Sequence, residues 1–356
     1  MNIVIKVGTQ SILSPDGTPF ERVMLHLVEQ IVSLQKAGHH VVLVSSGAVS
    51  SGRKIAQQTH GRQYGNSIGE KQLLASLGQH ELIRLYASLF KEHHILVSQL
   101  LLTKQDFQTR QHYLNIARLL REILQQKNIV PIINENDSVA IEELMFTDND
   151  ELAGLIAAQM NVEKLIILSN VQGVYTGHPD EPGSEIIPVI DPEKGWPEVS
   201  AVKSAQGRGG MNSKLATARK MSGLGITTHI ASIEVPSVLP RIIAEEPLGT
   251  LVLPSKKKSN IKKWMAYNNS KQNGAISINQ GLFNLLRENK RVISILPVGI
   301  EHCSGEFKKG DLVEILNPKG QKIGIGIAKY DVNKLSEYLG QKDKSVFIHY
   351  DHLHIF

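Results

Sequence analysis

Short apolar runs rich in β-branched residues alternate with helical patterns through residues 1–253. In the helical stretches apolar positions recur every three or four residues, whereas the runs between them are continuously apolar. Continuous apolar strands that alternate with helices are typical of a mainly parallel sheet covered by helices on both faces, so the pattern predicts an open α/β domain. The predicted strands are 3–7, 41–44, 95–102, 129–133, 165–168 and 226–231, and the predicted helices are 21–37, 70–91, 110–127, 150–160 and 211–222.

Residues 272–356 predict a second, small β-rich domain, a barrel or half-barrel whose short strands are separated by glycine turns. Its predicted strands are 274–279, 292–296, 312–316, 323–329 and 345–349, with one short helix at 282–288. Between the two domains, residues 254–271 are polar and rich in lysine, which predicts a basic linker. Within the first domain, 138–146 is predicted to be a hairpin insertion.

Four of the predicted strands end in small, polar or charged residues. In an open parallel sheet, ligands bind outside the carboxyl ends of the strands. The agreement of four strand ends therefore predicts one composite site. The segments at these ends are Lys6-Val7-Gly8-Thr9, Ser45-Ser46-Gly47, Asn134-Glu135-Asn136-Asp137 and Ser169-Asn170.

Lys6 interrupts an otherwise apolar strand. Burying an ammonium group is costly unless an anion meets it, and Gly8 would let backbone N–H groups approach a phosphate closely. The alternative is a lysine that extends to solvent at the strand end. We favour the anion-binding interpretation.

Two further segments open predicted helices. Residues 207–214 are rich in glycine and precede the helix 211–222, whose N-terminus would attract an anion and whose Lys214 would point back toward it. The alternative is a flexible loop with a surface lysine. Asp148-Asn149-Asp150 opens the helix 150–160, and one acidic or amide residue would suffice as a cap. We expect Asp150 to orient the two lysines, and Asp137 and Asn149 to bind a substrate ammonium group.

Composition narrows the class of protein. The chain has 356 residues, of which 41 % are apolar and 21 % charged, as is typical of soluble globular domains. No stretch approaches the roughly 18 uninterrupted apolar residues of a membrane-spanning helix. Cys303 is the single cysteine, which precludes an intramolecular disulfide and fits a reducing compartment. The N-terminus lacks a signal-peptide pattern. We expect a cytoplasmic protein without membrane association.

Charge is distributed unevenly. Residues 254–356 carry 17 basic and 9 acidic residues, and residues 1–253 carry 22 and 25. A basic tail is compatible with nucleic-acid phosphates, so an RNA-binding protein is an alternative function. The tail has few aromatic residues for base stacking, however, and its lysines cluster in the linker, so we do not expect RNA binding by the C-terminal domain.

Motifs of several enzyme classes are missing from the sequence. It contains no GxxxxGK[ST] P-loop, no protein-kinase motif set, no GxGxxG after a strand and no GxSxG. The histidine pairs 39–40 and 93–94 lack metal-ligand spacing. His349, His352 and His354 are an alternative metal site, but no cysteine or carboxylate set completes them, so we expect no protein-bound metal.

Five segments together resemble the amino-acid kinase family, and in particular its members that phosphorylate glutamate. The resemblance covers essentially the whole chain, and residues 274–330 resemble the PUA domain often appended to these enzymes. The Asn-Glu-Asn-Asp and Asp-Asn-Asp segments are the specific part. The five segments are Lys6–Thr9, Ser45–Ala48, Ile132–Asp137, Asp148–Asp150 and Gly209–Lys214.

This resemblance implies ATP-dependent phosphorylation of the L-glutamate γ-carboxylate, the first step of proline biosynthesis, with Mg²⁺ carried by the nucleotide. It places Lys6 and Lys214 at the transferred phosphoryl group and Asp150 between them as their organiser. The implied ATP site comprises Lys6, Gly8, Thr9, Ser169, Asn170, Arg208, Gly209, Gly210, Met211, Asn212, Ser213 and Lys214. The implied glutamate site comprises Ser46, Gly47, Asn134, Asp137, Asp148 and Asn149.

Two residues depart from the family pattern. Asn170 stands where an aspartate is common, and Arg208 stands where a small residue is frequent, so nucleotide or metal handling can differ. The resemblance also implies a homo-oligomer, either a tetramer or a dimer, with proline as a feedback inhibitor. Because an acyl phosphate hydrolyses readily, a glutamyl-phosphate reductase is an expected partner.

The motifs are also compatible with two related functions. An amino-acid kinase acting on N-acetylglutamate or aspartate would share most of these motifs. An acetylated substrate has no ammonium group, however, and would not need Asp137. A catalytically inactive nucleotide sensor is disfavoured because both lysines are retained.

Overall fold

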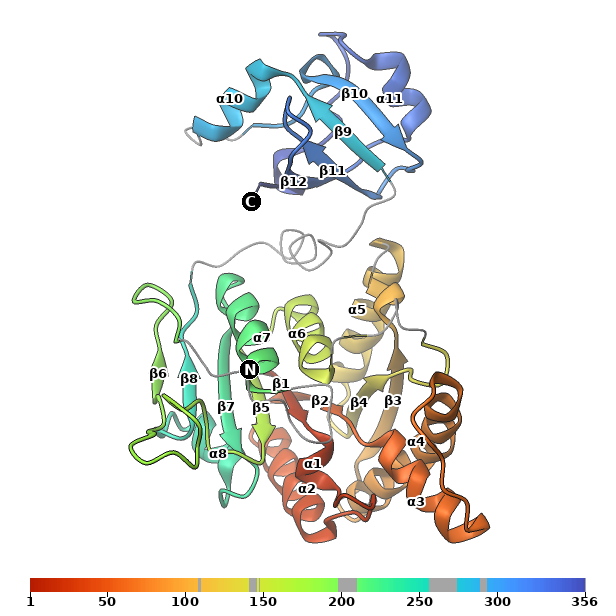
Figure 1. Cartoon of the computed structure of the whole chain (residues 1–356), viewed down its shortest axis with the longest axis vertical. Coiled ribbons are helices and arrows are strands. Elements are labelled where there is room, and N and C mark those ends of the chain that lie inside the picture. Colours follow the sequence, from red (N-terminus) through yellow and green to blue (C-terminus); the bar gives the residue numbers. More distant parts are fainter. Residues whose placement is uncertain are drawn as a thin grey trace. The chain divides into compact units, whose positions relative to one another are not determined.

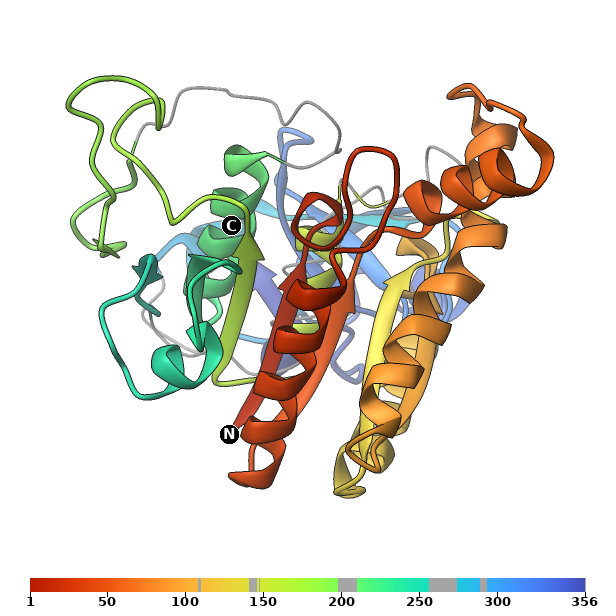
Figure 2. The same ribbon diagram turned by 90° about the horizontal axis from the view of Figure 1, so that it is seen from below.

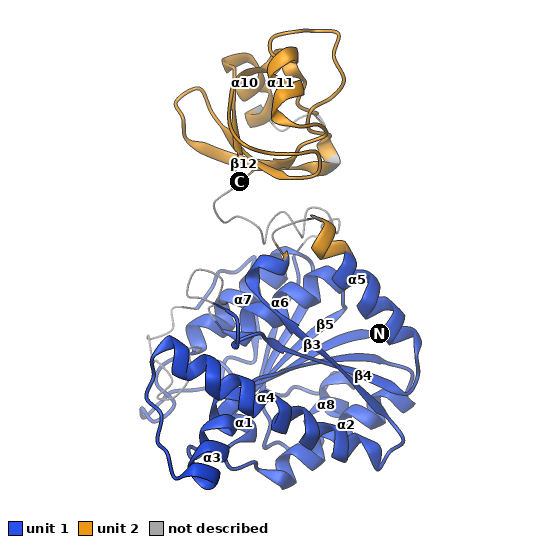
Figure 3. Cartoon of the chain, turned by 90° about the vertical axis from the view of Figure 1, so that its right-hand side faces the viewer, with its two compact units in different colours: residues 1–106, 115–257 blue, residues 107–114, 258–356 orange. Residues whose placement is uncertain are grey.

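A computed structural model describes residues 1–107, 110–140, 146, 148–197, 210–255, 274–288 and 293–355. The chain divides into two compact units (Figure 3). The first comprises Met1–Asp106 and Asn115–Lys257, and the second comprises Phe107–Leu114 and Lys258–Phe356. Each unit contains its own sheet.

The sheet of the first unit has eight strands in the order β3-β4-β2-β1-β5-β7-β8-β6. The first six strands in this order, β3, β4, β2, β1, β5 and β7, are parallel to one another, and β8 pairs antiparallel with β7. The predicted open, mainly parallel sheet is therefore confirmed. The strands are β1 (Asn2–Val7), β2 (His40–Ser45), β3 (Leu96–Leu102), β4 (Ile129–Glu135), β5 (Lys164–Ser169), β6 (Val189–Ile190), β7 (Thr227–Ser232) and β8 (Thr250–Val252).

Helices cover both faces of this sheet. On one face lie α5, α6 and α7, and on the other lie α2, α4 and α8 (Figures 1 and 3). Figure 2 shows the second face, with α2 and α4 in front of the strands. The helices are α1 (Thr9–Ile12), α2 (Glu21–Lys36), α3 (Ala48–His60), α4 (Ile68–Lys91), α5 (Arg110–Gln125), α6 (Asn149–Met160), α7 (Met211–Gly223) and α8 (Val238–Ile243), with a 3₁₀ turn η1 (Lys104–Phe107).

The alternation of side chains along β1 determines what each face of the sheet receives. Ile3, Ile5 and Val7 are fully buried in the apolar core beneath α2, α4 and α8. Because successive side chains of a strand point to opposite faces, Lys6 faces the side covered by α6 and α7. The ammonium group of Lys6, on a central strand, therefore points toward the face of the sheet on which α6 and α7 lie.

Strand order brings the predicted polar strand ends together. β4, β2, β1 and β5 are consecutive neighbours in the sheet, so the residues after each strand share one edge. The chain proceeds from β1 to β2 on one side, and β5 lies on the other side of β1. This is a topological switch point, the place where open α/β sheets bind ligands.

Helix α3 packs closely against α4 through two glycines. A Cβ atom on Gly52 would overlap the backbone oxygen of Leu74, and one on Gly78 would overlap the backbone oxygen of Ala48. The two helix backbones can approach this closely only because neither residue has a side chain. This contact holds the N-terminus of α3 at the sheet edge, beside the end of β2.

The second unit contains a five-stranded sheet in the order β10-β9-β11-β12-β13, around a core that includes Phe307 and Phe347. The predicted second β-rich domain is confirmed. Its elements are β9 (Gly274–Ile278), α10 (Gln280–Glu288), η3 (Pro297–Gly299), β10 (Ile300–Gly305), β11 (Leu312–Leu316), β12 (Lys322–Ile327), α11 (Val332–Tyr338), η4 (Tyr350–His352) and β13 (Leu353–Ile355).

Two predicted strands of this unit are wrong. In the described part of 292–296 and in 345–349 there is no regular strand, and Ile295 and Ile348 form only an isolated bridge. The sheet instead uses β10 and β13. β10 is largely exposed, so its sequence lacks the continuous apolar run used for prediction.

Other predicted segments fall partly or wholly outside the described residues. Residues 141–145 of the hairpin predicted at 138–146 lie outside the described residues. The linker predicted at 254–271 is described only at Pro254 and Ser255. In the described part of the chain, no helix is long and apolar enough to cross a membrane.

The α3–α4 contact predicts a stability difference between two glycines of one helix. We expect Gly78→Ala to lower the free energy of unfolding by about 1–3 kcal/mol or more, because its methyl group meets the α3 backbone. Gly69→Ala should be neutral or stabilise by up to about 1 kcal/mol, because a Cβ there meets nothing within 4 Å. Urea denaturation followed by circular dichroism measures both. Equal effects of the two substitutions would contradict the close packing.

Candidate active site

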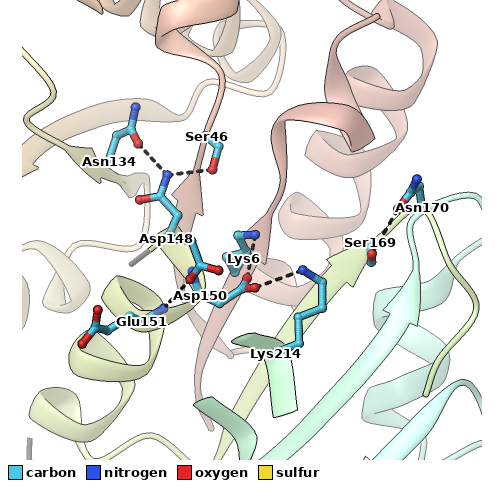
Figure 4. A network of polar contacts seen from close by, with 10 residues as sticks. Lys6, Ser46, Asn134, Asp148, Asp150, Glu151, Ser169, Asn170 and Lys214 are labelled. Atoms are coloured by element: carbon cyan, nitrogen blue, oxygen red, sulfur yellow. Dashed lines mark hydrogen bonds and ion pairs between the residues drawn. The ribbon is translucent and has the colours of Figure 1, made fainter. Parts of the chain in front are cut away.

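Two lysines that are distant in sequence meet one aspartate at the sheet edge (Figure 4). Lys6 Nζ lies 2.6 Å from Asp150 Oδ1, and Lys214 Nζ donates to Asp150 Oδ2 at 3.0 Å. Asp150 is completely buried, and the two lysine side chains are only 6 % and 11 % exposed. Both carboxylate oxygens are thus paired with ammonium groups, so the structure brings together the three residues that the sequence analysis expected to meet.

The electrostatic balance of this cluster keeps Asp150 ionised. Burial alone would raise the pKa of Asp150, but the ammonium groups of Lys6 and Lys214 outweigh burial and hold the pKa below its ordinary value of 3.8. A carboxylate with a lowered pKa and both oxygens paired is poorly suited to accept a proton. Asp150 is therefore suited to position the lysines rather than to act as a base.

The cluster of Lys6, Lys214 and Asp150 has a formal charge of +1 in a buried setting. Two helix N-termini at the same edge add to this positive character, because Gly47 before α3 and Gly210 before α7 provide no capping side chain. By contrast, Ser67 caps α4 and Asp331 caps α11 with side-chain hydrogen bonds. Uncapped N-termini keep backbone N–H groups available for an anion.

Beside the lysine cluster, polar side chains from α4, β4, α6 and the loop after β2 form a hydrogen-bonded chain, of which Figure 4 shows the part around Ser46 and Asn134. Asn149 Nδ2 donates to Ser46 Oγ at 2.7 Å and to Asn134 Oδ1 at 2.9 Å. Asn134 Nδ2 in turn donates to Gln79 Oε1 of α4 at 2.8 Å. Asn149 and Asp150 are adjacent at the start of α6, so one helix terminus supplies both this chain and the lysine cluster.

Asp148 holds that helix terminus in place. Its Oδ1 accepts from the backbone N–H groups of Asp150 at 2.9 Å and Glu151 at 3.1 Å, which is the expected geometry of an N-cap. Burial, and secondly repulsion by the Asp150 carboxylate, raise the pKa of Asp148. Phe146, two residues before Asp148, donates its backbone N–H to the side chain of Glu135 at the end of β4, at 2.8 Å. This hydrogen bond connects the segment that leads into α6 to the sheet.

The other predicted site residues lie at the same edge. Gly8 and Thr9 follow β1, and a Cβ on Gly8 would lie 3.5 Å from Lys6 Nζ. Ser169 is buried at the end of β5 and donates to Asn170 Oδ1 at 3.3 Å. Met211, Asn212 and Ser213 form the first turn of α7 behind Gly210, and Gly47 adopts φ +120° before α3. Asp137 is half-buried in the turn after β4. Arg208 and Gly209 lie outside the described residues.

Sequence reasoning missed Gln79 and the two glycines of the α3–α4 contact. Gln79 lies on the buried side of an otherwise amphipathic helix, where a polar residue needs a partner. Gly78 stands inside the predicted helix 70–91, where glycine costs stability and indicates a packing constraint, whereas Gly52 lies in α3, which was not predicted. These signals were present in the sequence, but their partners become known only from the tertiary structure.

Among the described residues, no group of three or more histidine, cysteine or acidic side chains is arranged to hold a metal ion.

Comparison with known proteins assigns the chain to a family. The amino acid kinase family matches residues 1–232, and the PUA domain matches residues 274–349. Because the first match covers well over half of the chain, this protein belongs to the amino acid kinase family.

Curated relatives extend the similarity over nearly the whole chain, and they carry the name glutamate 5-kinase. The protein from Chlorobaculum tepidum is 44 % identical over 99 % of this chain and 97 % of its own. The protein from Bacteroides thetaiotaomicron is 41 % identical over 99 % of this chain and 98 % of its own. That from Dictyoglomus thermophilum is 36 % identical over 97 % of this chain and 91 % of its own.

The lysine cluster predicts that two neighbouring acidic residues differ in their contribution to stability. We expect Asp150→Asn to lower the free energy of unfolding by roughly 3–5 kcal/mol, because it leaves two buried ammonium groups without a counter-charge. Glu151→Gln is the matched control. Glu151 contacts Lys104 at 3.6 Å and Lys220 at 3.9 Å, both partly exposed, so its loss should cost less than about 1 kcal/mol. Similar losses in urea denaturation would refute the assignment.

The same cluster predicts the sign of a pH dependence. Because the pKa of Asp150 is lowered on folding, its stabilisation is complete above the ordinary value of 3.8 and is lost as pH falls through the folded-state value. The stability difference between the wild type and Asp150→Asn should therefore be constant near neutrality and narrow below about pH 4. Denaturant titrations at several pH values measure it. A difference that widens in acid would show that burial outweighs the lysines.

Proposed function

We propose that this chain transfers the γ-phosphoryl group of ATP to the γ-carboxylate of L-glutamate, giving L-glutamyl 5-phosphate and ADP. This would be the first step of proline biosynthesis. The observation that carries the proposal is the buried Lys6–Asp150–Lys214 cluster at the shared ends of β1, β2, β4 and β5. The names of the full-length relatives support the choice of glutamate.

The site suits a reaction that needs charge neutralisation and no general base. A glutamate carboxylate has a reference pKa of about 4.3 and is already ionised at neutral pH. The obstacle is repulsion between this carboxylate and the terminal phosphate. Preorganised cations at the position where charge develops lower such a barrier. Lys6 and Lys214 fit this role, because Asp150 holds both ammonium groups at one point.

ATP would lie over the edge formed by β1, β5 and the start of α7. Gly8 has no side chain and so leaves room for phosphate oxygens, and the uncapped N-terminus of α7 offers backbone N–H donors to them. Mg²⁺ carried by the nucleotide would neutralise part of the phosphate charge. We place Ser169 and Asn170, together with Arg208–Lys214, along the nucleotide.

Glutamate would lie on the other side of the cluster, over β2 and β4. Ser46, Gly47 and the uncapped N-terminus of α3 offer donors for a carboxylate. Asp137 and Asn149 offer acceptors for the α-ammonium group, while Asn134 and Asp148 hold the surrounding side chains in place. We further propose a cytoplasmic homo-oligomer that proline inhibits and that delivers its labile product to a glutamyl-phosphate reductase.

Trapping the acyl phosphate with hydroxylamine tests the reaction, and removal of the lysine charges tests its mechanism. We expect Lys6→Met and Lys214→Met each to lower kcat by roughly 10²–10³-fold, as for loss of one preorganised donor. Lys220→Met, on the same helix as Lys214, is the control, because Lys220 is half exposed and forms its ion pair with Glu151. Near-wild-type hydroxamate formation in both Met variants would exclude the proposed mechanism.

A substrate panel distinguishes glutamate from the substrates of other amino-acid kinases. We expect ADP formation with L-glutamate and much less with N-acetylglutamate or L-aspartate. Asp137→Asn should raise the KM for glutamate by roughly 10- to 100-fold, the value of a hydrogen bond to a charged group, with a smaller change in the KM for ATP. Preference for N-acetylglutamate would redirect the assignment to a different amino-acid kinase.

A further inference from the structure

Gln79 is the one member of the polar chain that lies on a helix of the opposite sheet face. It belongs to α4 and is 9 % exposed, and its Oε1 accepts from Asn134 Nδ2 at 2.8 Å. Asn134 is also buried, at 2 % exposure. A polar group at such depth needs a hydrogen bond, and each of these two residues provides one for the other.

A backbone N–H group fixes the orientation of the first amide. Glu135 N donates to Asn134 Oδ1 at 2.9 Å, and a backbone N–H can only donate. The oxygen of Asn134 must therefore face Glu135, and its NH₂ group must face the opposite way, toward Gln79 Oε1. The assignment of O and N in this amide follows from the hydrogen bonds and not from the shape of the side chain.

The orientation of Asn134 then dictates that of Asn149. Since Asn134 presents an oxygen, Asn149 must turn its NH₂ group toward it, and the same nitrogen donates to Ser46 Oγ. Asn149 Oδ1 therefore points away from both partners. It is a buried acceptor with no hydrogen-bond partner among the residues that the structure describes. Ser46 Oγ accepts from Asn149, so its own proton is directed to another acceptor.

We propose that Gln79 is a positioning residue that fixes the amides of Asn134 and Asn149, so that Asn149 Oδ1 accepts from the substrate's ammonium group while Ser46 donates to a carboxylate. This inference rests on the proposed function. Among the charged groups of free glutamate, only the α-ammonium is a donor, and it matches the unpaired oxygen. The hydrogen-bonded chain thus gives the site one acceptor and one donor for a zwitterion.

Loss of the Gln79 acceptor should loosen this chain without altering the nucleotide side. In Gln79→Met, the buried NH₂ of Asn134 has no acceptor, so rotated arrangements of Asn134 and Asn149 become populated. We expect the KM for glutamate to rise roughly tenfold, the effect of one unpaired buried polar group, with the KM for ATP within about twofold of wild type. Gln79→Glu keeps an acceptor and should restore most of the glutamate affinity. Gln57→Met, at an exposed glutamine of α3, is the matched control.

A double-substitution cycle separates positioning from general destabilisation. In an Asn149→Ala background the hydrogen-bonded chain no longer includes the oxygen that binds the substrate's ammonium group. Gln79→Met should therefore no longer change the KM for glutamate. Parallel increases in both KM values, an undiminished effect in the Asn149→Ala background, or an unchanged KM in Gln79→Met would each overturn the inference. A wild-type enzyme that forms no hydroxamate from glutamate would instead overturn the proposed function, and this inference with it.

Discussion

The ion pairs between Asp150 and two lysines constrain the rest of the first unit. Lys6 belongs to a central strand that is buried on both faces, where an ammonium group is tolerated only with an anion beside it. That anion must come from the first turn of α6, and α7 must begin close enough to bring Lys214 to the same carboxylate. A slip of one residue along β1 would turn Lys6 into the apolar core beneath α2. The ion pairs therefore act together with the apolar alternation of β1 to select one register.

Topology explains how residues separated by some 200 positions reach one point. The neighbouring parallel strands β4, β2, β1 and β5 all end at the same edge of the sheet, and the segment after each strand starts there. Glycine replaces a capping side chain before α3 and α7, whereas Asp148 caps α6. This contrast agrees with the proposed function. An internally capped α6 presents Asn149 and Asp150 as fixed side chains, while the two uncapped helices keep backbone N–H groups available for ligands. The close α3–α4 contact through Gly52 and Gly78 carries Gln79 to the same place.

Two kinds of feature could be predicted from the sequence: secondary-structure elements with a regular pattern of apolar residues, and single residues that interrupt such a pattern. The parallel strands were predictable from continuous apolar runs, and Lys6 because it interrupts one. Asp150 and Lys214 were predictable from the segments that open their helices, and the acidic residues beyond what a helix cap requires led to the expectation that Asp150 orients the two lysines. Helix α3 was not predicted, because Ala48–His60 is rich in small and polar residues and its packing depends on glycine. β10 was missed because an exposed edge strand has no apolar run. Gln79 was missed because its partner, Asn134, lies 55 residues away.

The excess positive charge of the cluster connects stability with catalysis. Two buried ammonium groups share the carboxylate of Asp150, so these three residues have a formal charge of +1 in a poorly solvated place, and the nearby carboxyl group of Asp148 offsets it only in part, because burial raises its pKa. Such a charge lowers stability, and a fold selected only for stability would replace one lysine with an apolar residue. Its retention is understandable if a polyanionic ligand completes the balance. The same argument applies to Asn149 Oδ1 on the neighbouring side, a buried acceptor without a partner among the described residues, which would match a donor of the proposed substrate. Under the proposed function, both imbalances would be complementary to a pair of substrates, one rich in negative charge and the other a zwitterion. The stability that the protein loses through these unmatched groups would then be recovered as binding energy when the two substrates are brought together.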